Sequence, residues 1–138
     1  MQGIARFGVS LDKDLSVRFD NLIRKRKWKN RSEAFRKLIK KELVQDEWLK
    51  DQQTAGAIVF VYDHHKRELL NKIMHLQHDY SKLILSTQHI HLDHYNCLEV
   101  VVIKGRPSQV NELQSRLNTL KGMKCISLAM ASTGKEIP

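Results

Sequence analysis

Several residue types are scarce in this chain, and each scarcity argues against a class of protein. Only two cysteines occur among 138 residues, too few for the disulfide framework of a small secreted domain. No apolar run approaches the roughly 18 residues that cross a bilayer, and the first ten residues lack the apolar stretch of a signal peptide. We therefore expect a cytoplasmic protein without a membrane partner.

Acidic residues are also in short supply, and the imbalance is uneven along the chain. Lys and Arg number 24 against 15 Asp and Glu, and most of the excess lies in the first 50 residues. A basic segment joined to a nearly neutral remainder is typical of a polyanion-binding module attached to a second domain. A solvated basic surface without a partner is the alternative.

Apolar and polar side chains alternate over residues 4–11 (IARFGVSL), which predicts a short strand. The strand would turn Phe7, Val9 and Leu11 toward a core. No hairpin partner lies nearby, so both edges of the strand would be unpaired. The same strand of a second copy is the simplest partner, and the two would form an antiparallel ribbon.

Two amphipathic helices are predicted after this strand. Asp12 is placed to cap the first helix, and Asn30 is placed to cap the second. Glu33 lies three residues after Asn30, which is a capping-box arrangement. The free backbone amides at the start of the second helix, with Arg31 and Ser32 beside them, favour a phosphate site.

A strand followed by two helices in a basic module of this length resembles the ribbon-helix-helix DNA-binding fold. The resemblance implies that the ribbon of a dimer enters the major groove of double-stranded DNA. Its outward residues would face base edges, and the start of the second helix would hold a backbone phosphate. These candidate DNA contacts are Arg6, Gly8, Ser10, Asn30, Arg31 and Ser32. Gly8 departs from the usual pattern because it has no side chain to contact a base.

The pattern of the remaining chain predicts an α+β protein with two domains. Residues 1–50 form the ribbon-helix-helix domain, residues 51–55 form a short polar linker, and residues 56–138 form the second domain. Strands are predicted at 56–63, 83–92, 98–104 and 123–131, with helices at 66–80 and 110–120. This β-α-β-β-α-β order matches the ferredoxin-like arrangement of ACT-type domains. Cys125, on the last strand, is expected to be buried.

All seven histidines lie between residues 64 and 94, and the pattern there indicates a metal site. His89 and His91 are two apart on a predicted strand, so both side chains leave the same face. The turn at residues 93–96 would fold the next strand back and bring Cys97 beside them. Imidazole and thiolate ligands suit nickel, copper, cobalt or zinc. The fourth ligand must come from elsewhere, and His78 near the end of the preceding helix is placed to reach a neighbouring subunit.

Three longer segments extend the resemblance over essentially the whole chain. They are NRSEA at 30–34, YDHHKREL at 62–69 and the spaced residues QH, HIH and NCLE between 77 and 99. With the strand-helix-helix start, they resemble the NikR family of nickel-responsive transcription regulators. The resemblance implies a homotetramer, a dimer of dimers, that binds a palindromic operator and represses nickel uptake genes. Small organic substrates are not expected.

The same resemblance implies the residues of the metal site. His89, His91 and Cys97 of one subunit, with His78 of another, would bind one Ni(II) per subunit in square-planar geometry. The residues carried over by position as supports of these ligands are Tyr62, Gln77 and Glu99. The family pattern departs at Lys37, because an acidic residue one turn after Glu33 helps to hold a second cation there. Whether that cation site survives is therefore open.

Other basic residues have weaker expected roles. Lys66 and Arg67 form a basic tip beside two histidines and are candidates for phosphate contacts. The histidines outside the main set are candidate secondary metal contacts or solvent-facing residues: His64, His65, His75 and His94.

Three alternatives remain at this point. The scaffold could sense copper or cobalt, since intrinsic affinity favours Cu(II) over Ni(II). It could be a zinc metalloenzyme, although four protein ligands would leave no open position for water. It could be an amino-acid-sensing ACT regulator, which would not require His89, His91 and Cys97 together. The sequence contains no nucleophile elbow or phosphate loop, so we do not expect an enzyme.

Overall fold

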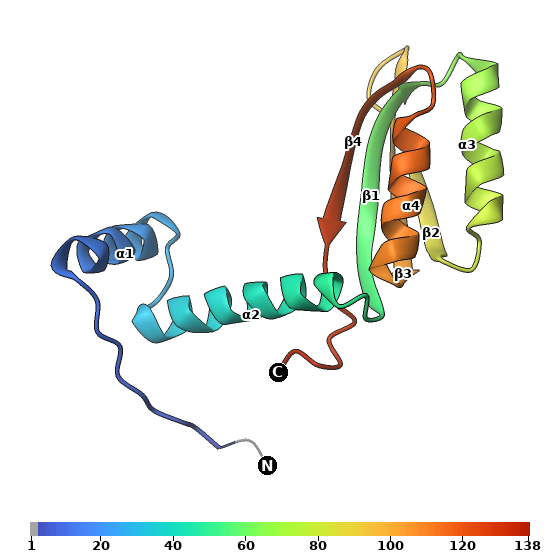
Figure 1. Ribbon diagram of the computed structural model, residues 1–138. Coiled ribbons are helices and arrows are strands. Elements are labelled where there is room, and N and C mark those ends of the chain that lie inside the picture. Colours follow the sequence, from blue (N-terminus) through green and yellow to red (C-terminus); the bar gives the residue numbers. More distant parts are fainter. Residues whose placement is uncertain (1–2) are drawn as a thin grey trace. The chain divides into compact units, whose positions relative to one another are not determined.

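The computed structural model describes residues 3–138, which form two compact units. One unit ends at Lys40 and the other spans Lys41–Pro138, so the division falls inside helix α2 (Arg31–Leu49) (Figure 1). No helix within the described range is long and apolar enough to cross a membrane.

The helix starts of the first unit form as their capping residues predict. Helix α1 (Lys13–Lys25) begins where the Asp12 carboxylate accepts a hydrogen bond from the Leu15 amide at 2.8 Å. At the start of α2, the Asn30 side chain accepts from the Glu33 amide at 2.8 Å. The Glu33 carboxylate accepts from the amide of Lys29, one residue before the position that a standard capping box uses. Local side-chain chemistry therefore fixes both starts.

Residues 4–11 do not form a strand in the single chain, and residues 3–12 contain no regular secondary structure. The predicted core positions are exposed: Phe7 by 72%, Val9 by 49% and Leu11 by 42%. The single chain therefore does not bury them, and their burial in a ribbon formed by two copies stays a prediction. The physical reason is that one strand has nothing to pair with, since its ladder hydrogen bonds need a second strand. The Phe7 and Phe35 ring centroids are 6.4 Å apart, and Val9 and Leu11 line a shallow hollow together with Phe19 and Phe35.

The second unit has the predicted βαββαβ order. Its elements are β1 (Thr54–Asp63), α3 (Arg67–Asp79), β2 (Ile84–His91), β3 (Asn96–Gly105), α4 (Pro107–Asn118) and β4 (Met123–Met130). The strands form one sheet in the order β2-β3-β1-β4, and all neighbouring pairs are antiparallel. Strand β1 begins at Thr54, inside the segment predicted as a linker.

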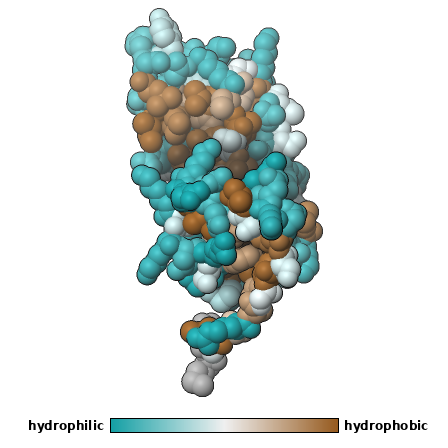
Figure 2. All heavy atoms as spheres, turned by 90° about the vertical axis from the view of Figure 1, so that its left-hand side faces the viewer, coloured by the Kyte–Doolittle hydropathy of each residue, from teal (hydrophilic) through white to brown (hydrophobic). Residues whose placement is uncertain are grey.

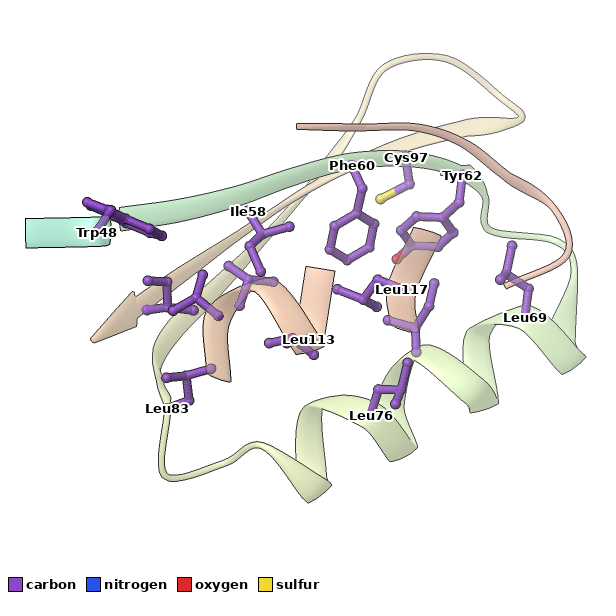
Figure 3. Packing of buried hydrophobic residues seen from close by; sticks show 14 residues of the cluster. Trp48, Ile58, Phe60, Tyr62, Leu69, Leu76, Leu83, Cys97, Leu113 and Leu117 are labelled. Atoms are coloured by element: carbon purple, nitrogen blue, oxygen red, sulfur yellow. The ribbon is translucent and has the colours of Figure 1, made fainter. Parts of the chain in front are cut away.

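One face of this sheet packs against α3 and α4 and holds the core. Phe60, Tyr62 and Cys97 point from the strands toward the helices, which contribute Leu76 and Leu117 (Figure 3). The last turn of α2 joins the same core through Trp48, whose indole N–H donates to the Ala131 carbonyl at 2.9 Å. The core therefore begins before the sheet does, at the end of α2.

Figure 2 shows apolar residues gathered on the face of the second unit that is turned toward the viewer. Cys125 on β4 is exposed, so the prediction that it is buried is wrong for the single chain. It pairs in register with Val61, whose side chain points away from the helices because its neighbours Phe60 and Tyr62 point toward them. Cys125 thus belongs to the sheet face opposite α3 and α4.

Candidate metal centre and nucleic-acid interface

Strand register places the predicted metal ligands of one chain around a single cavity. His91 lies opposite Cys97 and His89 lies opposite Glu99, so all four side chains share the helix-facing side of the sheet. They line a cavity of about 400 Å³ between β2, β3 and α3. The spacing argument for His89, His91 and Cys97 therefore leads to one shared wall in the folded chain.

A buried carboxylate organises the polar groups of this cavity. Glu99 is fully buried, and its Oε1 lies 2.5 Å from Nε2 of His89. The Tyr62 hydroxyl donates to Glu99 at 3.3 Å, and the Gln77 side-chain amide donates to the other carboxylate oxygen. Nδ1 of His89 faces the Tyr62 hydroxyl at 3.2 Å and Sγ of Cys97 at 3.9 Å. Of the three supporting residues carried over by position, Tyr62 and Glu99 thus contact the predicted ligand His89, and Gln77 reaches it through Glu99.

Burial sets the protonation of these groups. Desolvation raises the pKa of Glu99, while the charge of His89 and hydrogen bonds from Gln77 and Tyr62 oppose the rise. Desolvation, followed by the negative charges of Glu99 and Cys97, raises the pKa of Tyr62. Tyr62 therefore stays a neutral phenol that can donate a hydrogen bond, while Glu99 acts as its acceptor.

His78 lies apart from the other predicted ligands. It is exposed in the last turn of α3 and does not line the cavity, whereas its neighbour Gln77 does. Within residues 3–138 of one chain, no three His, Cys, Asp or Glu side chains are close enough together to hold a metal ion. The single chain thus brings three of the four predicted ligands to one cavity and leaves the fourth on the outside of α3.

The donor set fits a borderline transition metal. Two imidazoles and one thiol at the cavity are the ligand types that nickel, copper, cobalt and zinc accept. The His89–Glu99 contact is a carboxylate–histidine pair, which commonly fixes the orientation and tautomer of a metal-binding imidazole. The residues present are therefore compatible with the expected metal.

A second group of aromatic and imidazole rings adjoins this cavity. The ring centroids of His64 and His91 are 4.8 Å apart, and those of His64 and His65 are 4.2 Å apart. His94 packs against His65 at 5.0 Å. Desolvation, then the charges of His65 and His91, lowers the pKa of His64 and favours its neutral form. Sequence spacing did not indicate that His64 would line the cavity, because the contact joins the end of β1 to β2. His75 lies elsewhere, in a hollow between α3 and α4.

The candidate DNA contacts of the first unit differ in whether their side chains already bond to other residues of the chain. Arg6, Gly8 and Ser10 are exposed, and a Cβ added to Gly8 would meet no atom within 4 Å. Arg31 instead donates two hydrogen bonds to the Asp20 carboxylate, from Nε at 2.9 Å and from a terminal guanidinium nitrogen at 2.8 Å. The Asn30 side chain is used in the helix cap, and Ser32 is exposed.

The predicted basic tip at the start of α3 is larger than the sequence indicated. Lys66 and Arg67 are exposed and share a hollow with Lys72 and Lys121. Lys121 follows α4 in the chain, so only the folded structure brings it to this tip. Lys72 is partly neutralised by Glu68, at 3.2 Å on the same helix. The basic surface therefore combines two segments that lie far apart in sequence.

Comparison with known proteins matches both parts of the chain. Residues 55–131, more than half of the chain, match the family model of the NikR C terminal nickel binding domain. The chain belongs to the NikR family. Residues 5–46 match the model of the ribbon-helix-helix protein, copG family. Both parts of the fold class predicted from sequence are thereby confirmed.

Relatives of the NikR family cover nearly the full length of this chain. A protein of Syntrophus aciditrophicus named "Putative nickel-responsive regulator" is 52% identical, covering 98% of both chains. Proteins with the same name from Chlorobium phaeobacteroides and Desulfovibrio desulfuricans are 48% and 47% identical, covering 96% and 99% of this chain and 98% and 99% of their own. The chain therefore belongs to a family of regulators and is not an enzyme.

A solved structure supports the fold alone. An uncharacterized protein from Thermotoga maritima matches 57% of this chain and 98% of its own length, with a TM-score of 0.53 and 14% sequence identity. At that identity the likeness concerns the arrangement of elements and does not transfer a ligand or a partner.

Proposed function

We propose that this chain is a nickel-responsive DNA-binding regulator that represses nickel uptake genes. The observation that carries the proposal is the convergence of His89, His91 and Cys97 on one cavity wall, with His89 held by the buried Glu99. Family membership adds that the relatives are named for a response to nickel. Since its partner is chromosomal DNA, we place the protein in the cytoplasm.

The proposed metal site is completed by a second subunit. His89, His91 and Cys97 would hold one Ni(II) per subunit together with His78 of a neighbouring copy. Support comes from the position of His78, which is exposed on α3 outside the cavity of its own chain. When bound, nickel supplies a cross-link between subunits. The chain's own contribution is orientation, since Glu99 and Tyr62 both contact His89.

The proposed DNA interface is built from two copies of the first unit. Residues 4–11 of each copy would pair as a ribbon, which would bury Phe7, Val9 and Leu11 and present Arg6, Gly8 and Ser10 to the major groove. All six of these residues are exposed in the single chain, so they are available to a second copy and to DNA. The residues proposed to contact phosphates are Asn30, Arg31, Ser32, Lys66 and Arg67. Two ribbon dimers in a tetramer would bind the two halves of a palindromic operator.

The proposed switch depends on differential affinity. Nickel strengthens operator binding only if the DNA-competent arrangement of the tetramer binds nickel more tightly than the other arrangements do. By thermodynamic linkage, operator DNA should then raise the affinity for nickel by the same factor by which nickel raises the affinity for operator DNA.

The deciding experiment is operator binding with and without Ni(II), at a stated salt concentration. Since the operator is unknown, fragments would be selected from genomic DNA by the nickel-loaded protein and then titrated. We expect Cys97→Ala to lose the nickel response. The matched control is Cys125→Ala, which removes the other, exposed cysteine and should retain the response. Equal affinity with and without Ni(II) in the wild-type protein would overturn the proposed switch.

A second candidate is a sensor of copper or cobalt on the same scaffold. The imidazole and thiol donors favour it as well, because intrinsic affinity for such sites is highest for Cu(II). The two candidates differ in which metal restores operator binding to the metal-free protein at buffered, cell-like concentrations.

A further inference from the structure

A second cavity lies at the end of α2 and has no part in the proposed metal centre. It measures about 360 Å³, and its wall combines the last turn of α2, the segment before β1 and the C-terminal tail. The lining residues are Glu47, Gln52, Gln53, Thr133, Lys135 and Glu136. All of them belong to the unit that spans Lys41–Pro138.

Glu47 is the unusual member of this wall. It is only 6% exposed, and within residues 3–138 its buried Oε2 has no hydrogen-bond partner. A buried carboxylate oxygen without a partner is costly, because ionised groups lose much more on desolvation than neutral ones do. A positive ligand in the cavity would remove that cost.

Neighbouring contacts hold this part of the chain in place. The Ala131 carbonyl accepts two hydrogen bonds, from the Trp48 indole and from the Thr54 hydroxyl, both at 2.9 Å. The amide of Gln52 donates to the Glu47 carbonyl at 3.1 Å. The segments that form the cavity wall are thereby tied together, so Glu47 lies in a preformed surrounding.

The chemistry of the wall selects the kind of ligand. Its possible ligand atoms are carboxylate, amide and hydroxyl oxygens, and it contains no imidazole or thiol. Oxygen-only sites suit hard cations such as Ca²⁺, Mg²⁺ and K⁺ and suit nickel poorly. Lys135 offsets one of the two carboxylates, and no ion pair joins it to Glu47 or Glu136 among the described residues. One net negative charge therefore remains.

We propose that this cavity is a hard-cation site in which Glu47 is the principal ligand. The site is independent of the nickel function, because it shares no residue with the cavity of His89 and Cys97. A bound cation would tie the C-terminal tail to the last turn of α2 and stabilise the second unit.

The test is thermal unfolding of the full-length, nickel-free protein in a tetramethylammonium buffer, with Ca²⁺, Mg²⁺ or K⁺ added in separate arms. A cation that binds only the folded protein raises the unfolding midpoint in proportion to the logarithm of its concentration. We expect at least one arm to raise the wild-type midpoint by several degrees, and equilibrium dialysis to give one ion per subunit. The arm that responds identifies the cation.

Four variants make the test specific. Glu47→Gln keeps the size of the side chain and should abolish the cation effect, while Glu42→Gln on an exposed turn of the same helix should keep it. Lys135→Met removes a like charge and should tighten cation binding severalfold, which also tests the site if Glu47→Gln fails to fold. Cys97→Ala should respond to the hard cation as the wild type does. The proposal is overturned if no cation shifts the wild-type midpoint, or if Glu47→Gln and Lys135→Met respond as the wild type does.

Discussion

Glu99 and His89 illustrate how a single buried residue can orient a proposed metal ligand. The Glu99 carboxylate contacts Nε2 of His89 and also accepts hydrogen bonds from Tyr62 and Gln77. Gln77 precedes His78 on α3, so the network also reaches the helix that carries the proposed fourth ligand. The same carboxylate therefore contacts both the proposed ligand His89 and a side chain of α3.

Arg31 has an intramolecular partner that competes with its proposed phosphate contact. The Asp20 carboxylate accepts two hydrogen bonds from the guanidinium of Arg31. These bonds lower the pKa of Asp20, so this carboxylate stays charged. Asp20 lies eleven residues before Arg31, on the other helix of the unit. No local spacing rule joins them, which is why the sequence predicted a phosphate ligand but not its competitor.

Asp20→Asn should therefore strengthen DNA binding. Without the charged competitor, Arg31 is free to contact a phosphate, and one added phosphate contact steepens the dependence of log K on log salt by about 0.9. The measurement is a salt series of binding to non-specific duplex DNA by fluorescence anisotropy. Asp14→Asn is the matched control, since it breaks the exposed Asp14–Arg18 pair on the same helix. If both variants show the wild-type slope, Arg31 does not depend on Asp20 for its DNA contact.

At the scale of elements, the sequence predicts best those that satisfy their own hydrogen bonds or have strong apolar patterns. Helices α1 and α2 begin beside Asp12 and Asn30, as capping chemistry predicts. Strand β1 follows from the apolar run at 56–63. The predicted strand at 4–11 is different, because its proposed partner is a second chain and no local pattern specifies that pairing.

Asp51 connects the segment after α2 to the start of α4, two parts of the chain that lie far apart in sequence. Its carboxylate accepts from the amide and the hydroxyl of Ser108, at 2.7 and 3.0 Å, and so caps the start of α4 from the segment after α2. Its own backbone has a φ of 54°, a left-handed conformation that Asp and Asn tolerate better than most residues. A contact across 57 residues of sequence leaves no signal in local spacing.

The Asp51 cap should make stability depend on pH. The hydrogen bonds from Ser108, first from its amide and then from its hydroxyl, lower the pKa of Asp51 from 3.8 in the folded chain. A lowered folded pKa stabilises the protein above the unfolded value, and this contribution is lost as pH falls through the folded pKa. Denaturant midpoints of the wild type and Asp51→Asn should thus differ near neutral pH and converge in acid below about pH 4.

Asn is the informative replacement because it tolerates the left-handed backbone and keeps an acceptor oxygen, so the comparison isolates the charge. Asp46→Asn is the control, since Asp46 pairs only with the exposed Lys50 one turn away. A constant difference between wild type and Asp51→Asn at every pH would show that the charge of Asp51 contributes nothing.

At the scale of the whole molecule, several features of the single chain lack a contact that a second copy could supply. Phe7 and Val9 are exposed, Cys125 is exposed on the sheet face opposite α3 and α4, and His78 is separated from the cavity of its own chain. Sequence pattern predicted which residues of the candidate site share a face, because register is a local property. It could not show which contacts cross between copies, since these depend on assembly. A second copy is the simplest single explanation for all of them.

Mixing two inactive variants should show whether His78 acts between subunits. His78→Ala retains His89, His91 and Cys97, whereas Cys97→Ala retains His78, and neither variant alone should bind nickel through a complete site. If the fourth ligand comes from another copy, refolding the two variants together restores sites in which one subunit supplies the cavity and the other supplies His78. Random pairing would restore about a quarter of the sites, since half of the pairs are mixed and each mixed pair has one complete site.

The readout is the absorption band of thiolate-to-nickel charge transfer, which reports only sites that contain Cys97 bound to nickel. The control mixes His78→Ala with the double variant His78→Ala/Cys97→Ala, in which no subunit carries His78, so its band measures any background. A mixture of the two single variants that gives no more absorption than this control would place His78 within its own chain or outside the site. The proposed cross-link between copies would then lose its structural basis, because nickel held by one chain alone cannot favour one arrangement of subunits through shared ligands.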